Sequence, residues 1–220
     1  MKENYRNNRL GISSCLISIL VCAVITTACT NNAYEEGDGE LSHTTAEFVD
    51  VTVLKGTVAG IVNDEGKALT IKSGQTFGSV KTDTLMRCLL YYNKVEGQPV
   101  ELLSYKPVYV LATAKPTYKP TYDPVTLTSI WKANSGRYIN MQVGLKTGKI
   151  ETKKHELALV QDSVRTYGKG HIFYSLSHNQ NDIQQYYTES VYLSIPWAEQ
   201  DSVSVTVTTS EGAKMYTFTR

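Results

Sequence analysis

Residues 137–146 (RYINMQVGLK) and residues 202–208 (SVSVTVT) decide the fold class, because apolar and polar residues alternate in both stretches. Successive side chains of a β-strand point to opposite faces, so an alternation of period two predicts half-buried strands. Residues 49–53 and 171–178 alternate in the same way. A helical spacing of three and four is not evident along the chain. The sequence therefore predicts an all-β protein with antiparallel strands.

The C-terminal part of the chain, residues 125–220, is predicted to form an Ig-like antiparallel β-sandwich of about seven strands. The Cys…Trp…Cys pattern of true immunoglobulin domains is absent from it. The expected strands are residues 126–132, 137–146, 155–161, 171–178, 188–195, 202–208 and 213–219.

Residues 47–113 are predicted to form a separate small β domain of five or six strands, compatible with an OB-like barrel. The turn signal Asn63-Asp64-Glu65-Gly66 predicts a hairpin between residues 59–62 and 68–72. The lone Cys88 lies in an apolar run, which favours a buried and unreactive thiol.

A proline-rich segment, residues 114–124, separates these two parts. It repeats Lys-Pro-Thr-Tyr at residues 115–118 and 119–122. Regularly spaced prolines remove backbone donors and favour an extended chain, so we interpret the segment as a linker. Alternatively, its Tyr118 and Tyr122 form a recognition patch.

The first 28 residues are typical of a secretory signal. A basic start is followed by an uncharged apolar stretch at residues 10–25 and then by small residues. An apolar helix of this length spans roughly 24 Å, less than the ~30 Å hydrocarbon core, although a transmembrane anchor is the alternative. Residues 25–29 (ITTAC) resemble a bacterial lipobox, which implies cleavage before Cys29 and lipidation of its sulfur with fatty acids such as palmitate.

Residues 29–46 then hold the lipidated cysteine and a polar, acidic tether with Glu35, Glu36, Asp38 and Glu40. This cluster resembles a surface-export signal of Gram-negative lipoproteins, and a solvated spacer explains it equally well. We therefore expect an outer-membrane lipoprotein that is either periplasm-facing or surface-exposed, with the N-terminal lipid as its membrane contact.

The charge balance argues against nucleic-acid binding. The chain has 22 basic and 21 acidic side chains, whereas phosphate neutralisation needs a basic surface. No phosphate loop, G-x-S-x-G elbow, H-x-x-x-H or C-x-x-C motif occurs in the sequence. We accordingly expect a non-enzyme with neither metal nor cofactor, although a hydrolase that uses two carboxylates stays open.

Three triplets resemble the Asp-Ser/Thr-apolar acceptors of periplasmic O-glycosylation. They place the acceptor hydroxyls at Thr84, Ser163 and Ser202.

Several segments together resemble the NigD-like lipoproteins, a family named from a bacteriocin operon. The resemblance covers nearly the whole chain after the signal and implies an OB-type domain followed by a β-sandwich. The resemblance implies no catalytic residues in this chain, because none are established for the family. The segments are residues 48–53, 64–66, 87–92, 109–111, 123–125, 129–131, 138–142, 155–160 and 174–179. Trp131 and the pair His178-Asn179 are the most specific of them.

The functional hypothesis is a non-catalytic binding or accessory role at the cell envelope, with a protein or a glycan as the ligand. Tyr118, Tyr122, Tyr186 and Tyr187 are the candidate contacts, because tyrosine offers a large and rigid contact area. Bacteriocin immunity and envelope hydrolysis are the alternatives.

Overall fold

The computed structural model describes residues 44–76, 83–95, 97–115, 117–148, 153–162, 170–197 and 199–220. Residues 43–220 form one compact unit. The predicted signal peptide, Cys29, most of the tether and Ser163 lie outside the described residues. Within the described part, no helix is long and apolar enough to cross a membrane.

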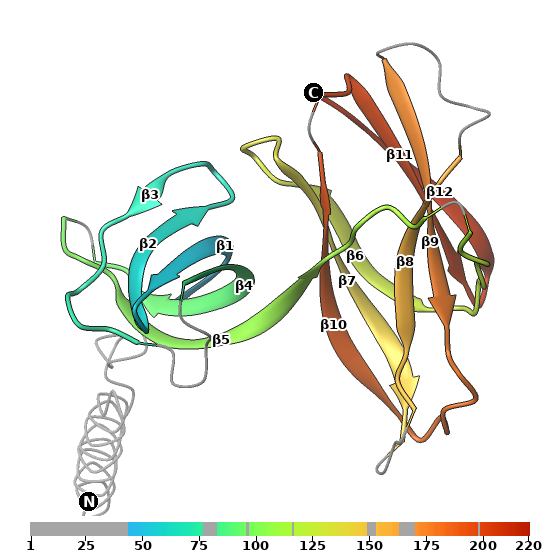
Figure 1. Cartoon of the computed structure of the whole chain (residues 1–220), viewed down its shortest axis with the longest axis horizontal. Coiled ribbons are helices and arrows are strands. Elements are labelled where there is room, and N and C mark those ends of the chain that lie inside the picture. The colour runs from blue at the N-terminus through green and yellow to red at the C-terminus, as the bar shows by residue number, and fades with distance from the viewer. Residues whose placement is uncertain are drawn as a thin grey trace, which may run out of the picture. The chain divides into compact units, whose positions relative to one another are not determined.

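The described residues form strands in two sheets (Figure 1). The larger sheet has the order β3-β2-β1-β4-β5-β10-β7-β6, and the smaller sheet has the order β12-β11-β9-β8. The strands are β1 (Thr44–Leu54), β2 (Thr57–Asn63), β3 (Ala68–Leu69), β4 (Thr84–Asn93), β5 (Glu101–Val110), β6 (Thr126–Lys132), β7 (Tyr138–Thr147), β8 (Glu156–Gln161), β9 (His171–Asn179), β10 (Tyr187–Pro196), β11 (Ser202–Thr209) and β12 (Gly212–Thr219).

Strands β1 to β5 curl around their own apolar core. β1 pairs with both β2 and β4, and a parallel bridge between Ile71 and Val100 joins the chain after β3 to the start of β5. The predicted hairpin is confirmed, with Gly66 at a φ of +81° in its turn. The strand neighbours are compatible with a small closed barrel, and the OB assignment stays a prediction. The core consists of Val49, Val51, Val53, Ile61, Cys88, Leu90, Tyr92 and Val100.

Strands β6 to β12 form a β-sandwich whose core lies between the two sheets. The expected alternation is present: the inward residues of β7 and β11 are buried. Two pairs of neighbouring strands run parallel, β5 with β10 and β9 with β11. The periodicity of a strand does not specify whether its neighbour is parallel or antiparallel. Its main core residues are Ile139, Met141, Val143, Leu145, Leu159, Leu176, Leu193, Ile195, Val203, Val205 and Val207.

The all-β class and the C-terminal sandwich are thus confirmed, with strand bounds within two residues of the expected ones. β5 links the two parts of the larger sheet, because residues 101–107 pair with β4 and residues 108–110 pair with β10. The predicted division into domains at residues 113 and 125 stays a prediction.

The proline-rich segment lies against the smaller sheet. Ala114 N donates to Leu159 O of β8 at 2.7 Å, and His178 N of β9 donates to Thr121 O at 2.9 Å. The buried Ser177 hydroxyl donates to Thr121 O at 2.8 Å and lies 3.1 Å from the Tyr118 hydroxyl. The segment is therefore held in place by hydrogen bonds on both β8 and β9.

Candidate functional site

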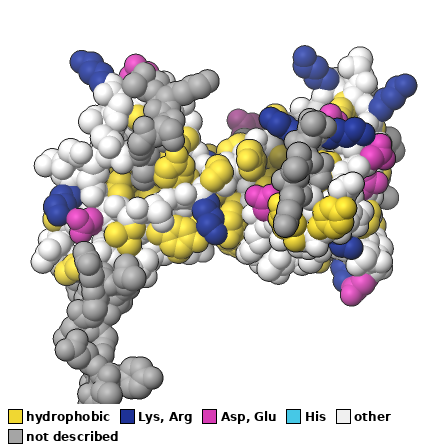
Figure 2. Space-filling model, turned by 90° about the horizontal axis from the view of Figure 1, so that it is seen from below, with side chains coloured by type: hydrophobic (Ala, Val, Ile, Leu, Met, Phe, Trp, Pro, Cys, Tyr) yellow, Lys and Arg dark blue, Asp and Glu magenta, His cyan; other side chains and the backbone are white. Residues whose placement is uncertain are grey.

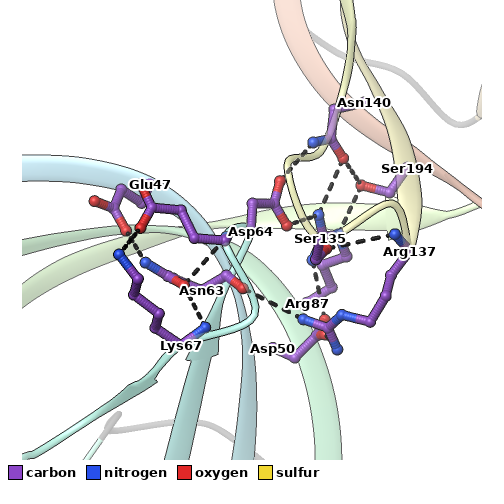
Figure 3. A network of polar contacts seen from close by, with 11 residues as sticks. Glu47, Asp50, Asn63, Asp64, Lys67, Arg87, Ser135, Arg137, Asn140 and Ser194 are labelled. Atoms are coloured by element: carbon purple, nitrogen blue, oxygen red, sulfur yellow. Dashed lines mark hydrogen bonds and ion pairs between the residues drawn. The ribbon is translucent and has the colours of Figure 1, made fainter. Parts of the chain in front are cut away.

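A buried polar network surrounds Arg87 where β1, β4, β7, β10 and the β2–β3 turn meet (Figure 3). Arg87 stands opposite Asp50 in the β1–β4 register, and its side chain is 1% exposed. Its Nη1 donates to Asp50 at 3.0 Å and its Nη2 donates to Asp64 at 2.6 Å. Nη2 also donates to Asn140 of β7 at 3.0 Å, and Nε donates to Ser194 of β10 at 2.7 Å.

These contacts join the two parts of the larger sheet. One guanidinium binds carboxylates from the barrel-like part and neutral polar groups from the sandwich. The Tyr138 ring lies 3.7 Å from the Arg87 Cζ atom, and burial raises the pKa of Tyr138, which keeps its hydroxyl protonated. Because a charge buried without partners is costly, these four hydrogen bonds favour one geometry of the junction.

The β2–β3 turn is part of the same junction. Asp64 Oδ2 accepts from Asn140 Nδ2 at 2.6 Å, and Asp64 O accepts from Ser135 N at 2.7 Å. Arg137 contacts both parts of the junction. Its Nη1 lies 2.8 Å from Asp50 Oδ2 of β1, and its Nη2 donates to Asn63 O at 3.3 Å. The turn is therefore bonded to the sandwich and does not project freely into solvent.

A cavity of about 440 Å³ lies beside this network. Its apolar wall is an aromatic cluster in which the Phe48 ring lies 5.2 Å from Trp131 and 5.8 Å from Tyr192. Trp131 and Tyr192 are only partly buried, so parts of both rings are accessible. The polar lining comes from Glu47, Asp64, Glu65, Lys132, Asn134 and Gln142. A concave site with aromatic walls and a few polar groups is the usual form of a ligand pocket.

The carboxylates that line the cavity are engaged in other contacts. Glu47 accepts from Asn63 Nδ2 at 3.1 Å, and both Asp64 oxygens are bonded in the network. Glu65 lies 2.7 Å from Lys67, and this hydrogen bond lowers the pKa of Glu65. A general acid of a glycosidase needs a raised pKa, so Glu65 is not suited to that role.

A second polar cluster joins two histidines. His155 Nδ1 lies 3.0 Å from His178 Nε2, and His178 Nδ1 lies 3.0 Å from Asp123 O. The carbonyl accepts, so His178 Nδ1 carries the proton and Nε2 accepts from His155. The described residues contain no group of three or more His, Cys, Asp or Glu side chains placed to hold a metal ion.

The candidate contact tyrosines do not lie in the aromatic cavity. Tyr118 is half-buried on Ser177, and Tyr122 is exposed beside His178. Tyr186 and Tyr187 are exposed at the start of β10. The sequence did not single out Phe48 or Tyr192 as site residues, although both are aromatic residues within predicted strands, because a strand pattern does not reveal which strands will be neighbours.

Two of the predicted glycosylation acceptors lie in strands. Thr84 begins β4 and Ser202 begins β11, and both are half-buried. Glycosylation at these positions stays a prediction. The prediction of a buried and unreactive Cys88 agrees with the structure, because burial raises the pKa of its thiol to about 12.

Comparison with known proteins gives similarities in family and fold. A family model described as the NigD-like C-terminal β-sandwich domain matches residues 110–220. A NigD-like immunity protein from Bacteroides caccae is 24% identical, with a TM-score of 0.61 over 80% of this chain and 96% of that one. A protein of unknown function from Bacteroides vulgatus is 18% identical, with a TM-score of 0.63 over 80% and 90% of the two chains.

A candidate lipoprotein from Bacteroides fragilis is 13% identical, with a TM-score of 0.58 over 80% of this chain and 97% of that one. These identities are low, so the solved structures establish a shared fold and nothing more. No curated protein matches the chain.

Replacing Arg87 tests the network. Arg87→Met leaves Asp50 and Asp64 without their shared guanidinium, and we expect it to lower the free energy of unfolding by about 3–5 kcal/mol. Arg137→Met removes an ion pair from a side chain that is 41% exposed, and we expect a loss of at most about 1 kcal/mol. Urea unfolding measures both. Equal losses for the two variants would contradict the central role of Arg87.

The histidine pair predicts a pH dependence of stability. Burial lowers the pKa of His178 below its usual 6.5, so the folded state binds fewer protons than the unfolded state near that pH. Stability is therefore complete above the unfolded pKa and is lost as the pH falls through the folded one. We expect a lower urea midpoint at about pH 5.5 than at about pH 8.

The variant His178→Gln should weaken this dependence, because no imidazole then titrates at the buried position. His171→Gln is the matched control on the same strand and should keep the dependence. An unchanged slope in His178→Gln would show that other groups cause it.

Proposed function

The chain belongs to the NigD-like family, and on that premise we propose that it is an outer-membrane lipoprotein with a non-catalytic binding or accessory role. The family model matches its C-terminal half, residues 110–220. The proposed ligand is a protein or a glycan at the cell envelope. No nucleic acid is expected as a partner.

The membrane attachment is supported by the N-terminal sequence. Residues 1–28 have the order of a secretory signal, and Cys29 follows in a lipobox-like context. A structural neighbour is described as a candidate lipoprotein, which agrees with this assignment. The charge of the chain is close to zero, so lipid rather than a basic patch would provide the attachment.

The binding role is supported by the cavity beside Arg87. Partly exposed Trp131 and Tyr192 supply flat apolar surfaces, and Gln142 and Asn134 supply amide groups on the rim. The wall is held in place because Phe48 packs against both rings and Arg87 is hydrogen-bonded to Asp50 behind it. A preorganised wall lowers the entropic cost of binding. This cavity is the observation that carries the proposal.

A non-catalytic role is supported by the state of the carboxylates in this cavity. Both oxygens of Asp64 are bonded to the Arg87 network, and Glu65 is bonded to Lys67. A hydrolase needs one carboxyl group with a raised pKa and a second one that is accessible to water or substrate. The contacts of Asp64 are those of a structural charge, whereas Glu65 forms a solvent-exposed ion pair.

Bacteriocin immunity is the second candidate, because one structural neighbour is described as a NigD-like immunity protein. Immunity is a special case of binding in which the ligand is a toxin. Deleting the gene distinguishes immunity from a general binding role. Unchanged sensitivity of the deletion strain to toxins of neighbouring strains would exclude immunity and leave only the general binding role.

Lipidation at Cys29 gives a direct test of the attachment. We expect metabolic labelling with palmitate to mark the natively expressed protein and to place it in the outer-membrane fraction. Cys29→Ser should remove the label and release the protein, because the thiol is the acceptor. Cys88→Ser is the matched control and should keep the label, since Cys88 is buried in the folded protein. A labelled Cys29→Ser variant would contradict the assignment.

Binding through the cavity is tested with the soluble form that starts after residue 29. We expect a glycan array and a pull-down from envelope extracts to give a ligand. Trp131→Ala should weaken its binding about tenfold or more, since buried aromatic contacts dominate such interfaces. Tyr216→Ala, on β12, is the control and should bind normally. Absence of any ligand, or equal binding by Trp131→Ala, would contradict the proposal.

A further inference from the structure

The N-terminal half of β10 has one unpaired edge. β10 pairs with β7 along its whole length, from Tyr187 to Pro196. On its other edge, it pairs with β5 only at Tyr192, Leu193 and Ser194. No strand among the described residues pairs with this edge at residues 187–191. An internal strand of the larger sheet thus has an open stretch of backbone.

The register identifies the backbone groups at this open edge. Ser194 O accepts from Leu111 N at 2.9 Å, so Ser194 directs its backbone groups away from β7. In an antiparallel pair, the residues that face one neighbour alternate with those that face the other. Ser190 and Thr188 share the direction of Ser194, and their N–H and C=O groups therefore point out of the ladder.

β5 does not cover this edge because it turns toward the barrel-like part. Residues 101–107 of β5 pair with β4, only residues 108–110 pair with β10, and residues 106–107 line the space beside β10. The two strands separate below the point where they pair (Figure 1). The space between them is a cavity of about 550 Å³, lined by residues 106–107, Tyr109 and residues 187–192.

The walls of this cavity favour an extended and acidic ligand. Tyr109 is 57% exposed and Tyr187 is 47% exposed, so both offer aromatic surface. Tyr109, Glu189 and Val191 also line the adjoining cavity, which contains Lys153 and Lys154. Lys106 and Lys154 stand against Glu189 in these cavities, whereas Lys153 is paired with Asp182 at 3.3 Å. The view from below shows hydrophobic side chains across the middle of the molecule, with both basic and acidic side chains around them (Figure 2).

We propose that the open edge of β10 binds an extended acidic segment of another protein by β-strand addition. The segment would run beside residues 187–191 and exchange backbone hydrogen bonds with Thr188 and Ser190. Its acidic side chains would meet Lys106 and Lys154, and its apolar side chains would meet Tyr109. This surface adjoins the cavity beside Arg87 and shares Tyr192 with it. The inference rests on the backbone edge at residues 187–191 and so does not depend on the ligand proposed for that cavity.

The test uses a proline at an outward-facing position. Ser190→Pro removes the N–H that points to the ligand but none of the bonds to β7. Ser190→Ala is the matched control, because both variants lose the hydrogen bond that Gln142 donates to the Ser190 hydroxyl. The probe is an acetylated peptide of about eight residues that alternates valine and aspartate, the usual length of a strand.

We expect the peptide to bind the wild-type protein and Ser190→Ala equally, and Ser190→Pro about tenfold more weakly. A lysine peptide of the same pattern should bind more weakly than the aspartate peptide, and Lys106→Glu should reduce that preference. Hydrogen exchange should show that the peptide protects the Thr188 and Ser190 amides. Thermal unfolding of Ser190→Pro checks that the variant is folded, and Lys106→Glu provides a second readout if it is not.

Three results would overturn the inference. One is equal binding by folded Ser190→Pro and the wild-type protein, and another is no binding of the acidic peptide by the wild-type protein. The third is a dimer in sedimentation that Ser190→Pro dissociates, because a second copy of this chain would then be the occupant of the edge.

Discussion

A buried guanidinium is costly unless it is hydrogen-bonded, and Arg87 obtains partners from both the barrel-like part and the sandwich only when the two adopt one arrangement. Asp50 and Asp64 come from one part, and Asn140 and Ser194 come from the other. Displacing either part would leave charged groups in an apolar surrounding. The network thereby selects one geometry for the junction, whatever its net contribution to stability.

The aromatic cavity depends on the same constraint. Phe48 lies two residues before Asp50 on β1, and Tyr192 lies two residues before Ser194 on β10. Because residues two apart in a strand share a face, the pairings that orient the polar network also bring the aromatic rings together. The open edge of β10 has a related origin. β5 pairs with β4 over residues 101–107 and reaches β10 only with residues 108–110, so the first half of β10 has no β5 neighbour.

Much of the sandwich could be predicted from the sequence, because alternation is a local property. The predicted strands at residues 126–132 and 202–208 differ from β6 and β11 by at most one residue. The Asn63–Gly66 turn was identified for the same reason, since its glycine adopts a positive φ within the turn itself. The proline-rich segment was expected to be extended throughout, but it makes a turn in which Tyr118 N donates to Lys115 O at 2.9 Å. Its bonds to β8 and β9 depend on strands that lie far away in the sequence.

The sequence by itself determined the all-β class, the places of most strands and the buried state of Cys88, because each follows from neighbouring residues and their burial pattern. Only the tertiary structure decided that Arg87, an isolated charge in an apolar run, is the centre of a network. It also decided that His155 lies beside His178 and that Trp131 lies beside Phe48. The physical reason is that strand order and register are set by long-range pairing, and periodicity along the chain specifies which face a residue occupies but not which strand it will meet.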